Sequence, residues 1–294
     1  MSNRPALSAR EGLRMKGIGS VRMKTRFLCC LLTLFAPGFC GLVCRAEALP
    51  FANGRWIDLT QEYSSETVYW PTASGFVLEK EFCGTTPKGY FYAANRYNAS
   101  EHGGTHLDAP IHFAEGRKTI EQLSLDQFMG AAVVVDVSSK ALRNPDYQIA
   151  IADLKAWESA HGRIPRGGIV LLRTGYAQYW PDAKKYLCTA EKGQQGVDNL
   201  HFPGLHPDAA RWLVNERAIK AVGLDTASID YGQSKLFETH RVLCGNDVLP
   251  LENLTALDKL PPTGAYVIAL PMKIKGGSGS PLRMIAWVPA NPAK

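Results

Sequence analysis

Residues 102–112 constrain this chain more than any other stretch. They read His-Gly-Gly-Thr-His-Leu-Asp-Ala-Pro-Ile-His, and they hold three of the chain's seven histidines together with an aspartate. Gly103, Gly104 and Pro110 are unfavourable in the interior of a helix. The pattern therefore predicts a tight turn that is followed by an extended segment.

The extended segment predicts a cluster of metal-binding side chains. Alternate residues of such a segment share a face, so His106 and Asp108 point to the same side, with His112 further along. The two glycines let the backbone fold back so that His102 meets them. Imidazole and carboxylate groups are ligands of borderline divalent cations. A surface loop that is merely rich in histidine is the alternative, and the density of ligands disfavours it.

Such a site predicts hydrolytic chemistry. A bound divalent metal lowers the pKa of its water toward about 7 and polarises a carbonyl group. A histidine close to that water can move its proton, which contributes roughly a hundredfold to ten-thousandfold to the rate. His112 is the best candidate for this role. Its alternative role is to orient a metal ligand by a hydrogen bond, without binding the metal itself.

Residues 49–294 read as one α+β domain, since no low-complexity linker, charge run or internal repeat divides them. Short apolar or β-branched runs bounded by glycine and proline predict strands. These runs are 56–60, 91–97, 131–137, 168–173, 219–224, 265–270 and 283–288. Two of them are continuously apolar, as is typical of strands buried on both faces. Helical spacing at 151–161 and 207–216 adds helices, so we expect a mixed sheet with helices on its outside.

Residues 1–48 are predicted to be a signal peptide that is removed on secretion. Three basic residues precede an apolar run, and the small residues Ala46 and Ala48 follow it as a cleavage step. Pro37 and Gly38 interrupt the run, so we expect no stable membrane span. An uncleaved membrane anchor is one alternative. An arginine-rich start that is poor in acidic residues leaves a mitochondrial transit peptide as the other.

The charge distribution argues against nucleic acid as a partner. The chain carries a net charge of +6, but eight of its 33 basic and two of its 27 acidic residues lie in residues 1–48. The remainder holds 25 of each sign and is neutral, whereas a nucleic-acid-binding protein keeps its positive field on the folded part. The glycine-rich stretch 276–280 lacks the spacing of a phosphate-binding loop, so no nucleotide site is predicted there.

Other hydrolase and metal-site classes are disfavoured. After residue 48 only Cys83, Cys188 and Cys244 remain, without a Cys-x-x-Cys pair, which excludes a cysteine-rich zinc site in that part. No Gly-x-Ser-x-Gly sequence occurs, which disfavours a serine hydrolase. Sequons for N-glycosylation begin at Asn98 and Asn253, close to the predicted site.

The spacing His-x-Gly-Thr-His-x-Asp-x-Pro-x-His resembles the signature of the metal-dependent cyclase-like hydrolases. That family includes bacterial kynurenine formamidases and isatin hydrolases, and the chain matches every fixed position of its signature. The pair Trp70-Pro71, residues 202–205 and residues 222–226 are also similar to the family. The resemblance spans roughly residues 56–288, and it implies a swivelling β/β/α fold and a homodimer or larger oligomer.

The resemblance also implies a ligand set. It implies a first metal bound by His102, His106 and Asp108, and a second metal that Asp108 shares with His240 and Glu252. The isatin-hydrolase branch of the family works with one metal, commonly manganese. Residues 230–235 and 271–274 are similar to that branch. The resemblance therefore leaves open whether the metal is zinc or manganese and whether one ion or two are bound.

The same resemblance implies that His112 is the catalytic histidine. Two aromatic residues, Trp70 and Phe113, are candidates to bind an aromatic substrate, although aromatic residues beside a site are as often ordinary core.

We therefore expect a metal-dependent amide hydrolase that acts on an aryl formamide, with N-formylkynurenine giving kynurenine and formate as the first choice. Opening of the cyclic amide isatin is the alternative. Two further hypotheses are a non-catalytic secreted metal-binding protein on the same scaffold, and a metal whose role is only structural.

Overall fold

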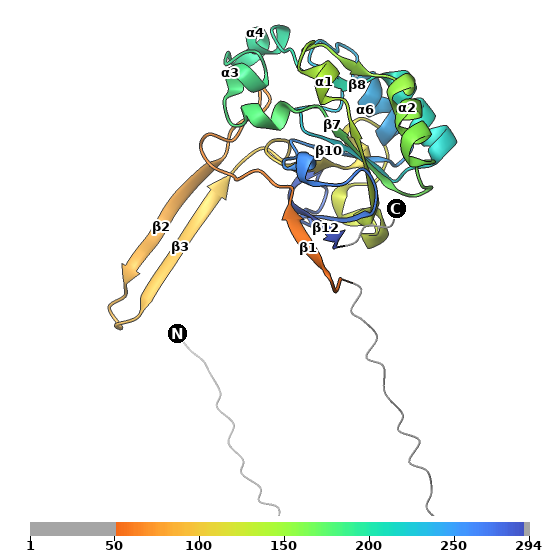
Figure 1. Ribbon diagram of the computed structural model, residues 1–294. Coiled ribbons are helices and arrows are strands. Elements are labelled where there is room, and N and C mark those ends of the chain that lie inside the picture. The colour runs from red at the N-terminus through yellow and green to blue at the C-terminus, as the bar shows by residue number, and fades with distance from the viewer. Residues whose placement is uncertain (1–50, 291–294) are drawn as a thin grey trace, which may run out of the picture. The chain divides into compact units, whose positions relative to one another are not determined.

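A mixed sheet of eight strands that closes on itself organises the computed structural model, which describes residues 51–290 (Figure 1). The strand order is β1-β12-β11-β5-β7-β9-β10-β4, and β4 pairs with β12 as well as with β10. The strands from β5 to β10 run parallel, and the other pairs are antiparallel. The strands are β1 (Gly54–Asp58), β4 (His106–Asp108), β5 (Met129–Asp136), β7 (Ile169–Arg173), β9 (Ala221–Leu224), β10 (Leu249–Glu252), β11 (Ala265–Pro271) and β12 (Gly279–Pro289).

Two apolar cores lie on opposite faces of this sheet. Along β5, Ala132 and Val134 contribute to the first core, whereas Val133 and Val135 contribute to the second. The first core also takes Leu107 of β4, so it fills the inside of the closed sheet. This alternation explains the continuous apolar runs in the sequence, because both faces of the parallel strands are buried.

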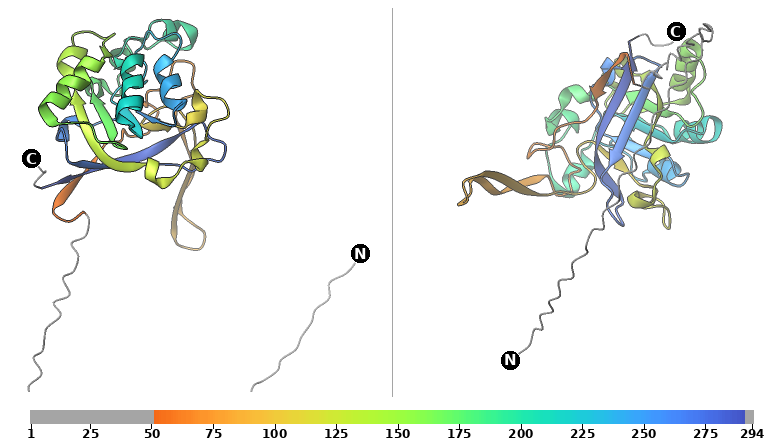
Figure 2. Two further views of the ribbon diagram at one scale, coloured as in Figure 1. Left: turned by 90° about the vertical axis from the view of Figure 1, so that its right-hand side faces the viewer. Right: turned by 90° about the horizontal axis from the view of Figure 1, so that it is seen from below.

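Helices cover the outer face of the parallel strands (Figure 2). They are α2 (Ile151–His161), α5 (Pro207–Trp212) and α6 (Glu238–Cys244), and all three contribute to the second core. The shorter elements are α1 (Ser138–Ala141), α3 (Ala183–Tyr186), α4 (Gly193–Asp198), η1 (Pro110–His112), η2 (Ile120–Gln122), η3 (Leu125–Gln127), η4 (Tyr176–Tyr179), η5 (Leu213–Arg217), η6 (Leu257–Lys259) and the paired strands β6 (Gln148–Ile149) and β8 (Gly204–Leu205).

The predicted fold class is confirmed: the chain has a mixed sheet with helices outside it. All seven predicted strands are present within a few residues of their expected bounds, and the helix at 151–161 has the bounds that the sequence predicts. The second predicted helix, 207–216, differs from the structure, because its last turn widens into the π-helical η5. Four strands were not predicted: β2 (Val77–Thr85), β10 and the two-residue strands β6 and β8.

Strands β2 and β3 (Phe91–Asn98) form a separate two-stranded hairpin, which we call the arm (Figure 1). The arm extends away from the closed sheet, and its large apolar side chains are exposed on the described chain. At its base, Tyr97 stacks on Phe76 and its hydroxyl donates a hydrogen bond to Met272 Sδ at 3.1 Å. Three consecutive charged residues, 79–81, interrupt the apolar residues of β2, so β2 lacked a strand pattern in the sequence.

The predicted signal peptide, residues 1–48, lies outside the described residues and stays a prediction. Within residues 51–290, no helix is both long and apolar enough to cross a membrane.

A buried carboxylate holds the start of α2. Asp153 accepts hydrogen bonds from the Ala150 backbone N–H at 2.8 Å, from the Tyr147 hydroxyl at 2.8 Å and from Lys140 Nζ at 2.5 Å. Burial acts to raise the pKa of Asp153, but the hydrogen bonds from Lys140, Ala150 and Tyr147 outweigh it and lower that pKa below its usual 3.8. The ionised form is therefore the one that the fold selects.

We predict that Asp153→Asn lowers the free energy of unfolding at pH 7 by about 1–3 kcal/mol, because three donors lose a charged acceptor. Since the folded-state pKa is lowered, this contribution is present above pH 3.8 and is lost as the pH falls through the folded-state value. Urea unfolding at several pH values measures the difference, which should shrink well below pH 3.8. Asp208→Asn, at an exposed carboxylate on α5, is the control and should cost about 1 kcal/mol or less. An equal loss for Asp153→Asn at acid and neutral pH would contradict the prediction.

Candidate metal centre

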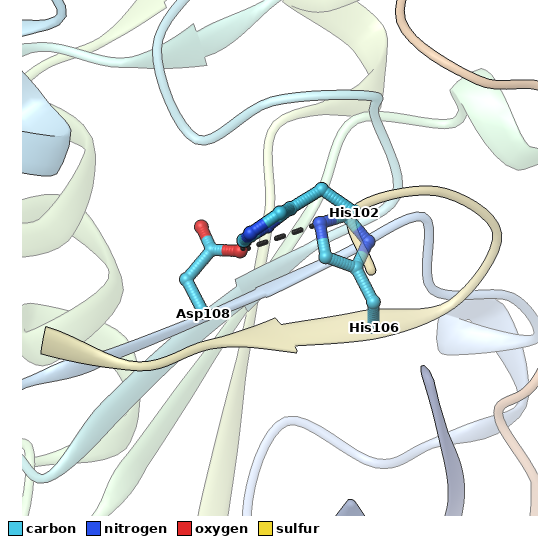
Figure 3. Close-up of side chains that lie close together, drawn as sticks. All are labelled: His102, His106 and Asp108. Atoms are coloured by element: carbon cyan, nitrogen blue, oxygen red, sulfur yellow. Dashed lines mark hydrogen bonds and ion pairs between the residues drawn. The ribbon is translucent and has the colours of Figure 1, made fainter. Parts of the chain in front are cut away.

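The centre is built on β4, the strand that closes the sheet. Leu107 points into the inner core, so His106 and Asp108 point to the opposite face, as the extended pattern predicts. In the register of β4 with β10, Glu252 lies directly opposite His106, and the two side chains approach to 3.4 Å between Nε2 and Oε2. The His106 ring also lies 3.3 Å from Asp108 Oδ1, measured from Nε2 (Figure 3).

The two glycines return His102 to this face. Gly104 adopts a φ of +58°, and a Cβ there would meet the Tyr63 ring at 2.6 Å, whereas a Cβ at Gly103 would meet the Tyr69 ring at 2.1 Å. With the backbone packed this closely, His102 Nδ1 lies 2.7 Å from Asp108 Oδ1 (Figure 3). The sequence analysis predicted this return from the glycine pair.

His240 enters from the first turn of α6. Its Nε2 lies 3.2 Å from Asp108 Oδ2 and 3.1 Å from Glu252 Oε1. Its Nδ1 lies 2.7 Å from Asp230, which also accepts hydrogen bonds from the backbone N–H groups of Thr239 and His240 at 3.0 Å. Asp230 therefore orients the His240 ring and also accepts hydrogen bonds from backbone N–H groups in the first turn of α6, which have no partner within the helix.

His112 ends η1 and stacks on His102 with 3.8 Å between ring centroids. Burial lowers the pKa of His112 to about 3, against the attraction of Asp108 and with the help of the neighbouring imidazoles. The ring is therefore neutral at neutral pH and has a free lone pair.

The donors form two groups that could each hold a metal ion, and Asp108 belongs to both. One group is His102, His106 and Asp108, and the other is Asp108, His112 and His240. Within each group the ligand atoms lie within 4.8 Å of one another. Glu252 falls outside both groups, but its carboxylate oxygens lie 3.1 Å from His240 Nε2 and 3.4 Å from His106 Nε2. The structure therefore brings all five predicted ligands together, with His112 beside them.

The charges of the centre suit a cation. Asp108 is fully buried, and Glu252 is 4% exposed. Burial disfavours a charged imidazole, yet hydrogen bonds to Asp108, Asp230 and Glu252 raise the pKa of His240 well above its usual range. The carboxylates thus attract positive charge to a buried position, and the nitrogen and oxygen donors are those that zinc and manganese accept. The residues present fit a divalent metal.

A cavity of about 270 Å³ opens onto the centre. Both residues predicted to bind an aromatic substrate, Trp70 and Phe113, line it. Phe237, which the sequence analysis missed, completes this aromatic wall at 6.1 Å from Trp70 and 5.4 Å from Phe113 between ring centroids. Phe237 holds a φ of +48°, which is uncommon for a bulky residue and occurs here directly before α6.

Two other residues near the centre were not predicted to have a functional role. Asp230 had entered only as part of a similar stretch, and no local pattern separates it from a surface aspartate. Asn253 had entered as a sequon, but it is buried: its Nδ2 donates to the Gly104 carbonyl at 2.9 Å and its Oδ1 accepts from Tyr186 at 3.0 Å. Glycosylation of Asn253 is therefore incompatible with this fold, whereas Asn98 is exposed at the end of β3.

Comparison with known proteins is consistent with this geometry. A family model described as "Putative cyclase" matches residues 57–231. Isatin hydrolase from Roseibium aggregatum is 32% identical over 76% of this chain and 89% of its own length. Kynurenine formamidase from Bacillus cereus is 29% identical over 79% of this chain and 97% of its own. The solved structure of isatin hydrolase A from Ralstonia solanacearum superposes with a TM-score of 0.72 at 35% identity, over 80% of this chain and 92% of that one.

A closed mixed sheet with a histidine and carboxylate centre on its outer face defines a class of metal-dependent hydrolase folds. Within that class, this chain belongs to the cyclase family.

We predict that Gly104→Ala destabilises the fold through two separate effects. The positive φ costs about 1–2 kcal/mol for a residue with a side chain, and the contact with Tyr63 adds about 1–3 kcal/mol. Gly116→Ala is the matched control, because Gly116 has a φ of +73° but open space around its Cβ position. Urea unfolding of both variants should show the larger loss for Gly104→Ala. Equal losses would mean that the close approach to Tyr63 does not matter.

Proposed function

We propose that this protein is a metal-dependent hydrolase of small aromatic amides. The observation that carries the proposal is the shared carboxylate of Asp108, whose two oxygens face different sets of imidazoles beneath an aromatic cavity. The relatives that share this fold are named as hydrolases of an aromatic amide, isatin, or as formamidases.

The metal would be held by His102, His106 and Asp108, with His240 and Glu252 available for a second ion. When bound, a divalent cation lowers the pKa of water and polarises the amide carbonyl. Zinc and manganese both fit the nitrogen and oxygen donors, and the choice between them is part of the experiment below.

His112 is proposed to carry the proton. Its neutral ring can accept a proton from the attacking water and return it to the leaving nitrogen as the carbon–nitrogen bond breaks. Phe113 packs against His240 with 4.4 Å between ring centroids. This contact holds the aromatic wall of the cavity beside a candidate metal ligand. An aromatic ring of the substrate would lie against Phe113, Trp70 and Phe237.

The lining of the cavity favours a compact neutral substrate. Apart from the metal-centre residues, its described walls are apolar, aromatic or uncharged, and they include neither lysine nor arginine. The amino-acid group of N-formylkynurenine would find no ionic partner there, whereas the bicyclic amide isatin needs none. We therefore place isatin-type opening first. An aryl formamide stays the second candidate, because the Bacillus cereus relative is named a formamidase.

The test is hydrolysis by the purified chain from residue 49, with isatin and N-formylkynurenine offered in parallel after chelation and after return of zinc or manganese. Turnover restored by metal is the expected result. Asp108→Asn should lose both metal and turnover, because it removes the carboxylate that both groups share. His112→Ala should retain metal and lose about a hundredfold or more in rate; loss of metal instead would make His112 a ligand. Bound metal without turnover of either substrate would favour the non-catalytic protein.

We also propose that two copies associate through the arm. Seven large apolar side chains are exposed on it, and an isolated two-stranded hairpin is marginally stable in water. The exposed residues are Val77, Leu78, Phe82, Tyr90, Phe91, Tyr92 and Tyr97. The arm also carries acidic and basic residues side by side, such as Glu79 with Arg96, which suits pairing with an identical surface.

We predict that Leu78→Asp combined with Phe91→Asp shifts the protein from dimer to monomer, because each places a charge in the buried interface. Light scattering coupled to size-exclusion chromatography measures the mass. Leu125→Asp, which is as exposed as Leu78 but lies off the arm, should leave the mass unchanged. A monomeric wild-type protein, or a double variant that remains dimeric, would contradict the proposal.

A further inference from the structure

The glycine-rich stretch 276–280 lies against the outer side of His102. Gly279 opens β12 and pairs with Asp108 in the register of β12 with β4. A Cβ at Gly279 would meet His102 Cε1 at 2.4 Å, and a Cβ at Gly277 would meet Glu101 Oε1 at 3.0 Å. The glycines therefore allow this loop to approach the Nε2 side of the His102 ring, whose Nδ1 faces the metal centre.

One hydroxyl joins this loop to the ring. Ser278 Oγ lies 2.8 Å from His102 Nε2 and 2.8 Å from Glu101 Oε2. The same carboxylate oxygen accepts a hydrogen bond from the Ser278 backbone N–H at 3.0 Å, so Ser278 is held at two atoms. The side chains form an unbroken line from Glu101 through Ser278 to His102.

The direction of these hydrogen bonds follows from counting protons. A carboxylate only accepts, and a hydroxyl has a single proton. Ser278 therefore donates to Glu101 and must accept from His102 Nε2–H. Asp108 Oδ1, which lies 2.7 Å from His102 Nδ1, also only accepts, so a proton or a cation must lie between these two atoms. With a metal ion bound there, Nδ1 would offer its lone pair to the metal and Nε2–H would stay with Ser278.

His102 is in this respect the reverse of the other two histidines. His106 Nδ1 donates to the Gly104 carbonyl at 2.9 Å, and His240 Nδ1 is held by Asp230, so each presents Nε2 to the centre. His102 alone presents Nδ1, and it alone needs a partner on Nε2.

We propose that Glu101 and Ser278 are positioning residues that hold His102 in the tautomer protonated at Nε2, with its Nδ1 lone pair aimed at the metal. This inference rests on the metal centre of the proposed function. Without the hydroxyl, the ring can rotate or change tautomer and present a proton where the metal requires a lone pair. Partners of this kind typically change metal affinity by 10–100-fold.

The first test is metal affinity in the chain from residue 49, made metal-free and titrated with zinc and with manganese against a competing chelator. Ser278→Ala and Glu101→Gln should each bind about 10–100-fold more weakly than wild type. Ser278→Thr keeps the hydroxyl and should restore most of the affinity. Ser280→Ala is the matched control, because the Ser280 hydroxyl donates to the Pro281 carbonyl and not to a histidine.

The second test reads the tautomer in the zinc-bound protein. Long-range ¹H–¹⁵N spectra of the histidine side chains should show His102 protonated at Nε2 in wild type and in Ser278→Thr, with that preference lost in Ser278→Ala. A far-ultraviolet circular dichroism melt establishes that each variant is folded.

The outcomes separate this proposal from the proposed function. A wild-type protein that binds neither metal overturns the proposed function, and this inference falls with it. A wild-type protein that binds metal, with Ser278→Ala and Glu101→Gln within twofold of it, overturns only the positioning role. A zinc-bound wild-type protein with His102 protonated at Nδ1 also overturns it, whatever the affinities are.

Discussion

The backbone hydrogen bonds on both edges of β4 hold the fold and the centre together. This strand has three residues, yet it closes the sheet by pairing with β10 on one side and with β12 on the other. Leu107 anchors it in the inner core, which leaves His106 and Asp108 on the outer face. A shift of one residue in register would bury the two ligands in that core and expose the leucine. The apolar core therefore fixes the position of the polar site.

The closed sheet also determines which side chains surround Asp108. Its neighbours across β12 and β10 come from strands that lie more than 130 positions later in the chain, and His240 comes from the helix that packs over them. Each of the three imidazoles nearest to Asp108 has its outer nitrogen held by a carbonyl, a carboxylate or a hydroxyl. Buried carboxylates such as Asp108 destabilise the fold unless a positive charge compensates them. The hydrogen bonds to the outer nitrogens keep the imidazole lone pairs directed toward Asp108, where a bound cation would supply that charge.

The sequence allowed the local part of this site to be predicted, and the distant part only through resemblance. The glycine pair and the alternation of His106 with Asp108 are short-range facts of backbone geometry, so the turn and the shared face followed from them. Glu252 and His240 could be assigned only by similarity, since nothing near them in sequence reports what they face. Asp230, Phe237 and Ser278 lie in irregular segments, where function depends on tertiary packing that no local period encodes. The strand β10 was missed because it reads Leu-Pro-Leu-Glu, and a proline inside a run argues against a central strand.

The position of His112 links the number of metal ions to the chemistry. The two oxygens of Asp108 face different imidazoles, so this carboxylate would be among the ligands of one ion or of two. At the second position, the ligand set of Asp108 and His240 could be completed either by His112 or by Glu252. If Glu252 completes it, the lone pair of His112 remains free to take a proton, with one ion or with two. If His112 were to complete it, that lone pair would be committed to the metal, and the ring could not act as the proposed base. The stack of His112 on His102, a candidate ligand of the first group, places the ring beside the centre in either case. Whether a second ion would assist or hinder hydrolysis would therefore depend on which of Glu252 and His112 bound it.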